Sequence, residues 1–140
     1  MSTNPAFIAH YREADRATQS LADHLRAVAA QASCFAEKIG LVRQGELIGL
    51  LHDVGKYSDE FQAYLKSAVG LLNQDDDEEF VDAKGLKGKV DHSTAGAQLA
   101  YTELAKHGQL GEIVGKALAL FRLCQIRSWS SRFACSIQCM

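Results

Sequence analysis

The sequence has little proline and no long apolar run. Among its 140 residues there is a single proline, and β-branched residues are few. Because proline interrupts helices and β-branched side chains favour strands, this composition predicts a helical chain with no convincing strand. No apolar run has the length that crossing a bilayer needs, and the N-terminus lacks the charged-then-apolar pattern of a signal peptide. We therefore expect a cytoplasmic protein that has no membrane partner.

An excess of positive charge is also missing, since the formal net charge is −2 at pH 7. This charge argues against a protein that holds DNA by charge alone, but not against an enzyme that engages phosphate through metal ions. Cysteine is sparse as well. Cys34 lies alone in an apolar helical pattern and is expected to be a small core residue. The other three cysteines fall in the last 22 residues without a CxxC pair, so we expect neither a common zinc pattern nor a disulfide framework.

The remaining composition, 47% hydrophobic and 23% charged, is that of one globular domain with one core. Residues 1–19 are expected to be an irregular leading segment. Ser20 and Asp23 form a capping box, which predicts a helix that starts near Leu21 and ends before Gly40. Its inward stripe consists of Leu21, Leu25, Val28, Ala32, Phe35 and Ile39, and His24 lies on the same face.

A second helix is predicted from about Gln44 to Val54, ending at Gly55. Leu47, Ile48, Leu50 and Leu51 make it apolar on most sides, which indicates a central position. Gly45 and Gly49 lie four residues apart and would let another helix approach closely. His52 and Asp53 are adjacent at the end of this helix. Burying a carboxylate is expensive unless a partner or a metal takes its charge, so this pair predicts a cation nearby.

Three further helices complete the predicted fold. One follows the cap Ser58, with Phe61, Leu65, Ala68, Val69 and Leu72 as its packed face. Residues 73–89, an acidic run followed by lysines, are interpreted as a solvated loop, with an acidic cation site as the less favoured alternative. A fourth helix starts at Asp91 or Ser93, has a small-residue face and ends near His107. A fifth runs from about Leu110, with an inward face that extends to Phe121.

Four residues stand out as metal ligands: His24, His52, Asp53 and His92. Each lies on or at the start of a predicted helix, and neutral imidazole and carboxylate are good ligands for first-row divalent metals. An aspartate can bridge two ions, which makes Asp53 the natural centre of a one- or two-metal site for phosphoryl chemistry. Simpler readings stay open: His24 as a satisfied core histidine and His92 as a helix-start residue. His10 and His107 are interpreted as surface or loop histidines.

Three segments resemble the HD superfamily: Leu21-Ala-Asp-His24-Leu25, Leu51-His52-Asp53-Val-Gly-Lys56 with the following Ser58-Asp-Glu-Phe-Gln-Ala-Tyr-Leu65, and Asp91-His92-Ser-Thr-Ala-Gly-Ala97. More narrowly, they are similar to the HD nuclease domain of the CRISPR-associated nuclease–helicase of type I systems. The similarity covers about residues 7–119. It implies an all-α HD helical bundle over residues 20–120.

The resemblance also implies a function, namely metal-dependent endonuclease cleavage of single-stranded DNA in antiviral defence. It matches His24, His52, Asp53 and His92 to metal ligands, and makes Asp53 and Lys56 the catalytic candidates. An equal alternative for Lys56 is a structural role, as a lysine near a helix C-terminus. The implied cofactor is one or two divalent ions (Mn, Ni, Co, Fe or Mg), and histidine ligation favours a transition metal. The implied partners are single-stranded DNA, a helicase module and a CRISPR surveillance complex.

The sequence departs from that family near its end. The family has a histidine pair and a later aspartate, but this chain has no histidine after His107 and no aspartate after Asp91. Residues 121–140 are expected to be an aberrant tail of a frameshifted or truncated product, with weak or absent DNA cleavage. Two alternatives stay open, an HD phosphohydrolase of nucleotides and a non-catalytic metal-binding remnant.

Overall fold

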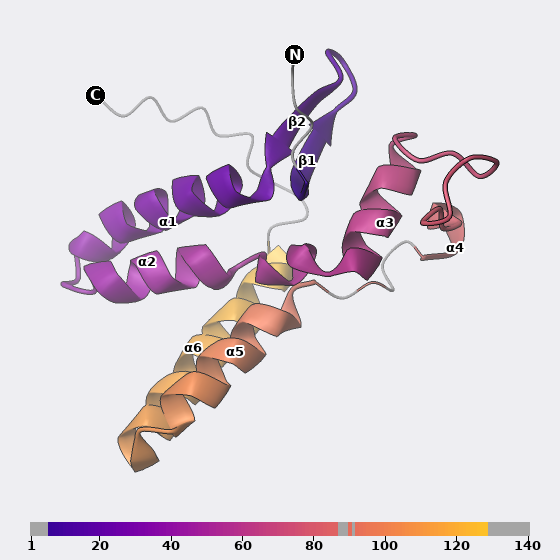
Figure 1. Cartoon of the computed structure of the whole chain (residues 1–140). Coiled ribbons are helices and arrows are strands. Elements are labelled where there is room, and N and C mark those ends of the chain that lie inside the picture. The colour runs from indigo at the N-terminus through magenta and orange to yellow at the C-terminus, as the bar shows by residue number, and fades with distance from the viewer. Residues whose placement is uncertain (1–5, 87–89, 91, 129–140) are drawn as a thin grey trace.

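A computed structural model describes residues 6–86, 90 and 92–128, with side chains up to residue 120 (Figure 1). The fold is mostly helical with one small two-stranded sheet. Its elements are β1 (Ile8–Arg12), β2 (Ala17–Ser20), α1 (Leu21–Glu37), α2 (Val42–Leu51), the 3₁₀ helix η1 (Val54–Tyr57), α3 (Asp59–Ala68), α4 (Ala83–Leu86), α5 (Thr94–Ala105) and α6 (Gly108–Ser128). The all-α prediction is therefore confirmed as the class of the fold.

Side-chain caps begin two helices where the sequence predicts them. The Ser20 hydroxyl accepts a hydrogen bond from the Asp23 backbone N–H at the start of α1, and the Ser58 hydroxyl accepts one from the Phe61 N–H at the start of α3. Each cap satisfies a backbone donor that has no partner within its own helix. These local signals set the starts of α1 and α3, the helices that come before α2 and after η1.

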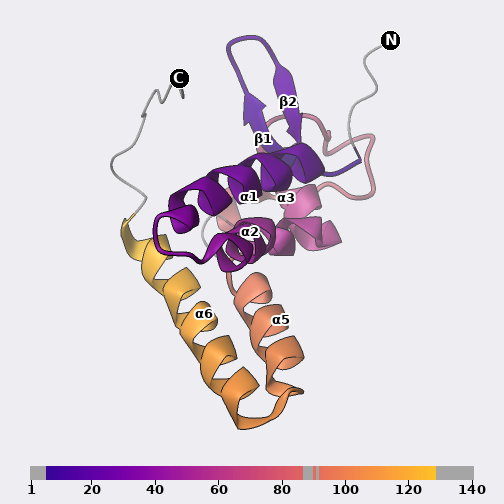
Figure 2. The same cartoon turned by 90° about the vertical axis from the view of Figure 1, so that its left-hand side faces the viewer.

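Helices α1 and α2 form one antiparallel pair, and α5 and α6 form a second that projects away from it (Figures 1 and 2). The close approach of α1 to α2 depends on two buried glycines, Gly45 and Gly49. A Cβ at Gly45 would lie 2.6 Å from both the Ala32 carbonyl oxygen and the Ala36 Cβ, and one at Gly49 would meet the Ala29 backbone. The predicted role of this glycine pair is confirmed.

The small-residue face of α5 lies against the end of α2. Gly96, Ala97 and Ala100 are buried, and a Cβ at Gly96 would run into the Leu51 carbonyl oxygen. Gly55 allows a second approach, because a Cβ there would lie 2.7 Å from the His92 carbonyl carbon. The end of α2, where His52 and Asp53 lie, is thus packed closely against the start of α5.

The expectation of an irregular segment without strands before residue 20 is wrong for the described residues. β1 and β2 form an antiparallel hairpin in which His10 pairs with Gln19 and Tyr11 with Thr18, and the register is irregular between Ile8 and His10. The hairpin stands at the start of α1 (Figure 1). Its base is buried, with Ile8 1% and Ala9 2% exposed. Contacts with residues far along the chain hold it there, and the local sequence pattern does not show them.

Several burial predictions are also wrong. Leu21 and Leu25 are buried, but Phe35 and Ile39 at the far end of the predicted stripe are 54% and 72% exposed, and Cys34 is exposed. The second helix is not central, since its buried residues are the two glycines, while Leu47 and Leu50 are exposed.

Three expectations concern the later part of the chain. The acidic loop contains a short helix, α4, that was not predicted. Helix α6 continues to Ser128, so residues 121–128 of the expected tail are helical, whereas 129–140 lie outside the described residues. Asp91, one of the two cap candidates for α5, also lies outside them, and the other, Ser93, is the N-cap without a side-chain cap hydrogen bond. None of the helices in the described part combines the length and apolar character that crossing a membrane requires.

Candidate metal centre

Three of the four predicted ligands meet at the end of α2. His52 is the C-terminal cap residue of α2, Asp53 is the N-cap residue of η1, and His24 lies at the end of the first turn of α1. Each side chain is largely covered, with exposed fractions of 15% for His24, 19% for His52 and 16% for Asp53. The break between α2 and η1 turns the adjacent histidine and aspartate toward the same point, which one continuous helix would not do.

The donor atoms of these residues form a small triangle. The Nε2 atoms of His24 and His52 are 3.0 Å apart, and each lies 3.4 Å from the Oδ2 atom of Asp53. With metal–nitrogen distances of about 2.1 Å, ligands to one ion lie about 3.0 Å apart in octahedral and about 3.4 Å apart in tetrahedral geometry. The triangle therefore fits three ligands on one face of a first-row divalent ion.

The second nitrogen of His52 sets its tautomer. Nδ1 lies 2.7 Å from the Gly49 carbonyl oxygen, which can only accept, so Nδ1 carries the proton and donates it. In the neutral ring Nε2 then holds a lone pair that points at the triangle. This arrangement, with one ring nitrogen bonded to a backbone carbonyl and the other free to ligate, is the usual one for metal-binding histidines.

Asp53 remains ionised despite its position. Burial by itself raises the pKa of its carboxyl group, but hydrogen bonds from His24 and Lys56 outweigh that effect, so the net pKa lies well below its usual range. The Lys56 Nζ atom is 2.9 Å from Asp53 Oδ2, and its side chain is only 7% exposed. The same ammonium group donates to the Ala9 carbonyl oxygen at 3.2 Å. Lys56 thus links the carboxylate of the triangle to the β-hairpin.

Sequence reasoning missed His10, which it interpreted as a surface or loop residue. His10 is exposed as a residue, yet its ring lies edge-on to that of His24, with centroids 4.7 Å apart. Donor atoms of His10, His24 and Asp53 all lie within 4.8 Å of one another and form a group that could hold an ion. No local signal could have found this residue, because its position depends on the unpredicted hairpin.

The fourth predicted ligand, His92, is not part of the ion-sized group found among the described residues. Its ring packs on Phe61, with centroids 4.6 Å apart. Its Nδ1 atom is buried and has no hydrogen-bond partner in the described part of the chain. Its role as a metal ligand stays a prediction. His107 is exposed at the end of α5, which agrees with its interpretation as a surface histidine.

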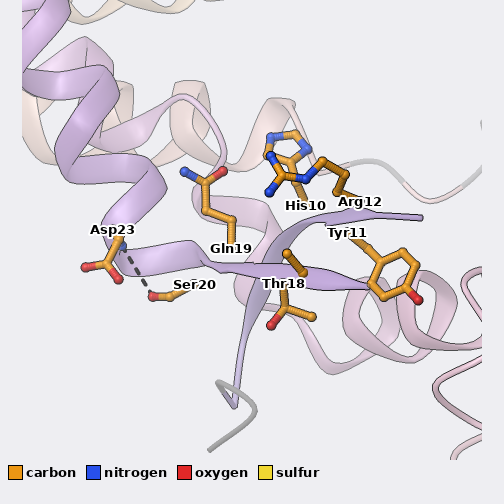
Figure 3. Close-up of a pocket in the computed structure, with 8 residues that line it drawn as sticks. His10, Tyr11, Arg12, Thr18, Gln19, Ser20 and Asp23 are labelled. Atoms are coloured by element: carbon orange, nitrogen blue, oxygen red, sulfur yellow. Dashed lines mark hydrogen bonds between the residues drawn. The ribbon is translucent and has the colours of Figure 1, made fainter. Parts of the chain in front are cut away.

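A polar cavity adjoins the centre along the hairpin. It has a volume of about 530 Å³ and extends over both strands to the start of α1. In Figure 3 His10, Arg12 and Gln19 project from one side of the hairpin, and Tyr11 and Thr18 project from the other. His10 belongs both to this cavity and to the ion-sized group, so the cavity opens beside the candidate centre.

Two imidazoles and an ionised carboxylate thus converge from α1 and from the junction of α2 with η1, in an arrangement that could hold a metal ion. The comparison with protein families agrees: the HD domain model matches residues 21–123, which is most of the chain, and the protein belongs to the HD family. HD domains are typically metal-dependent phosphohydrolases. No curated protein and no solved structure matches the chain.

The donor set therefore fits the divalent ion that the family implies, and His24, His52 and Asp53 are the residues that would hold it. When bound, such an ion supplies a Lewis acid for a phosphoryl oxygen and for a water nucleophile. The protein's own residues prepare the site. Gly49 fixes the His52 tautomer, and Lys56 keeps Asp53 charged and in place.

Proposed function

We propose that this protein is a metal-dependent phosphodiesterase that cleaves single-stranded DNA, acting as an endonuclease in CRISPR antiviral defence. The observation that carries the proposal is the triangle of His24, His52 and Asp53, whose spacing matches the ligand shell of one transition-metal ion. The resemblance of residues 58–65 and 91–97 to the nuclease branch of the HD superfamily supports DNA as the substrate. Helices α3 and α5 both contact η1, whose N-cap residue is Asp53.

Individual residues have defined roles in this proposal. His24, His52 and Asp53 bind the ion, and Asp53 is the residue that the reaction needs most, since it alone brings negative charge to the triangle. Lys56 is buried and bonded to Asp53 and Ala9, which supports a positioning role rather than a direct contact with phosphate. The phosphodiester would approach through the cavity that lies along the hairpin and the start of α1.

The test is cleavage of a fluorescently labelled single-stranded oligonucleotide by the purified chain with Mn²⁺ or Ni²⁺. We expect slow, metal-dependent cleavage that Asp53→Ala abolishes and that the matched surface variant His107→Ala leaves unchanged. Chelation of the metal should stop it. Cleavage that survives both Asp53→Ala and chelation would come from a contaminant, and metal binding without any cleavage would favour a non-catalytic metal-binding remnant.

A second candidate function is phosphohydrolysis of nucleotides. The polar cavity beside the candidate centre favours it, since His10 belongs to both. The two substrates can be told apart by measuring phosphate release from nucleoside monophosphates and triphosphates under the same metal conditions. Turnover of free nucleotides without cleavage of DNA would replace the nuclease proposal with this one.

The proposed partners follow from the proposed activity. A nuclease for single-stranded DNA acts on strands that a helicase module and a CRISPR surveillance complex have opened, and it works in the cytoplasm. The net charge of −2 gives the chain little affinity of its own for a phosphate backbone. Delivery of the strand by such partners is consistent with that charge.

A further inference from the structure

We propose that His10 is an additional metal ligand supplied by the β-hairpin, so that binding of the ion locks the hairpin onto the helices. The inference rests on the proposed metal centre and extends it to an element outside the residues that match the HD family, which begin at residue 21. His24 and the His52-Asp53 pair come from helices. His10 would add a donor from the sheet.

The geometry of His10 is the first support. Its donor atom lies within 4.8 Å of those of His24 and Asp53, which already lie 3.4 Å from each other. Two nitrogen ligands on opposite sides of one ion are separated by about 4.2 Å. The donor atoms of His10, His24 and Asp53 are thus close to the separation of ligands that share one ion, and rotation of the exposed His10 side chain would bring its imidazole nearer.

An irregularity in the hairpin directs the His10 side chain toward the centre. Regular alternation along β1 would place Ile8 and His10 on the same face of the sheet. The irregularity between them leaves both Ile8 and Ala9 buried, at 1% and 2% exposed, while His10 projects beside His24. Irregularities of this kind re-aim single side chains and occur often next to active sites.

Two buried polar side chains clamp the strand in place. The Gln62 side chain accepts a hydrogen bond from the Ile8 N–H at 2.9 Å and donates to the Ile8 and Lys56 carbonyl oxygens at 3.0 and 2.8 Å. Lys56 Nζ donates to the Ala9 carbonyl oxygen and contacts Asp53. A continuous chain of contacts thus joins the Asp53 carboxylate, through Lys56, to the residue that precedes His10.

Two measurements on the intact chain test this proposal. X-ray absorption of the Ni²⁺-loaded protein should show three imidazole ligands, from His10, His24 and His52. Titration calorimetry with Ni²⁺ should show that His10→Gln weakens binding by about tenfold or more, whereas the matched surface variant His107→Gln has no effect. Added Ni²⁺ should also slow amide hydrogen exchange in residues 8–12 of the wild type and not in His10→Gln.

The outcomes separate this inference from the proposed function. A wild-type protein that binds no Ni²⁺ overturns both. A wild-type protein that binds through only two imidazoles, with equal affinity in His10→Gln and no change in hairpin exchange, overturns the role of His10 and leaves the three-residue centre standing. The absorption measurement needs no variant, so it holds even where His10→Gln destabilises the hairpin.

Discussion

At the residue scale, the ammonium group of Lys56 holds the Asp53 carboxylate in place. Lys56→Met should lower the free energy of unfolding of the metal-free protein by about 3 kcal/mol, because it leaves a largely buried carboxylate without its strongest partner. The same change removes the link between Asp53 and the strand that carries His10, so metal should bind more weakly. Urea unfolding and Ni²⁺ calorimetry measure the two effects. A variant that keeps both its stability and its metal affinity would contradict the positioning role of Lys56.

The turn of the hairpin holds a second residue-scale test. The Asp15 carboxylate accepts two hydrogen bonds from Arg12, at 2.8 and 2.6 Å, and this pairing lowers its pKa to about 2. Because the folded pKa is depressed, the pair supports the hairpin at neutral pH and loses that support as the pH falls through about 2. Arg12→Met should return the pKa toward 3.8 in an NMR titration. Arg26→Met is the matched control, and an unchanged pKa in Arg12→Met would refute the pairing.

At the element scale, the α1–α2 contact depends on the absence of side chains. Gly45→Ala would place a methyl group 2.6 Å from the Ala32 carbonyl oxygen, so we expect the free energy of unfolding to fall by about 1–3 kcal/mol. This loss exceeds the gain of up to about 1 kcal/mol that alanine brings to a helix. Gly85→Ala is the control, since a Cβ there meets nothing within 4 Å. Urea denaturation compares the two, and an equal effect would argue against close packing.

Some secondary-structure elements and site residues were predictable from the sequence, and others were not. Ser20 and Ser58 act within one turn of the chain, so the helices they start were predictable, and the helical period placed His24 on an inward face. The meeting of His24, His52 and Asp53 followed from adjacent helices. The hairpin was missed because Gln62 holds Ile8 from 54 residues away, and His10 was missed with it. The exposure of Phe35 was not predicted, because the helical period shows which residues share a face but not how far a neighbouring helix covers that face.

At the scale of the whole molecule, the candidate centre joins three parts of the chain: the hairpin, α1 and the junction of α2 with η1. An ion bound there should stabilise all three together, since it binds only the folded arrangement. At a Ni²⁺ concentration about 100 times the dissociation constant, the stabilisation is about 2.7 kcal/mol, which corresponds to a rise in Tm on the order of 10 °C for a chain of this size. Differential scanning calorimetry measures the rise.

Two carboxylate variants decide where that stabilisation originates. Asp53→Ala should abolish the rise in Tm, because it removes the only anion of the triangle. Asp76→Ala changes the acidic run at residues 75–79 instead and should leave the rise intact. If Asp76→Ala abolished it and Asp53→Ala did not, the ion would bind the acidic loop, and the helices around His24 and His52 would owe their arrangement to packing alone. A rise that persists in both variants would mean that the metal acts elsewhere on the chain.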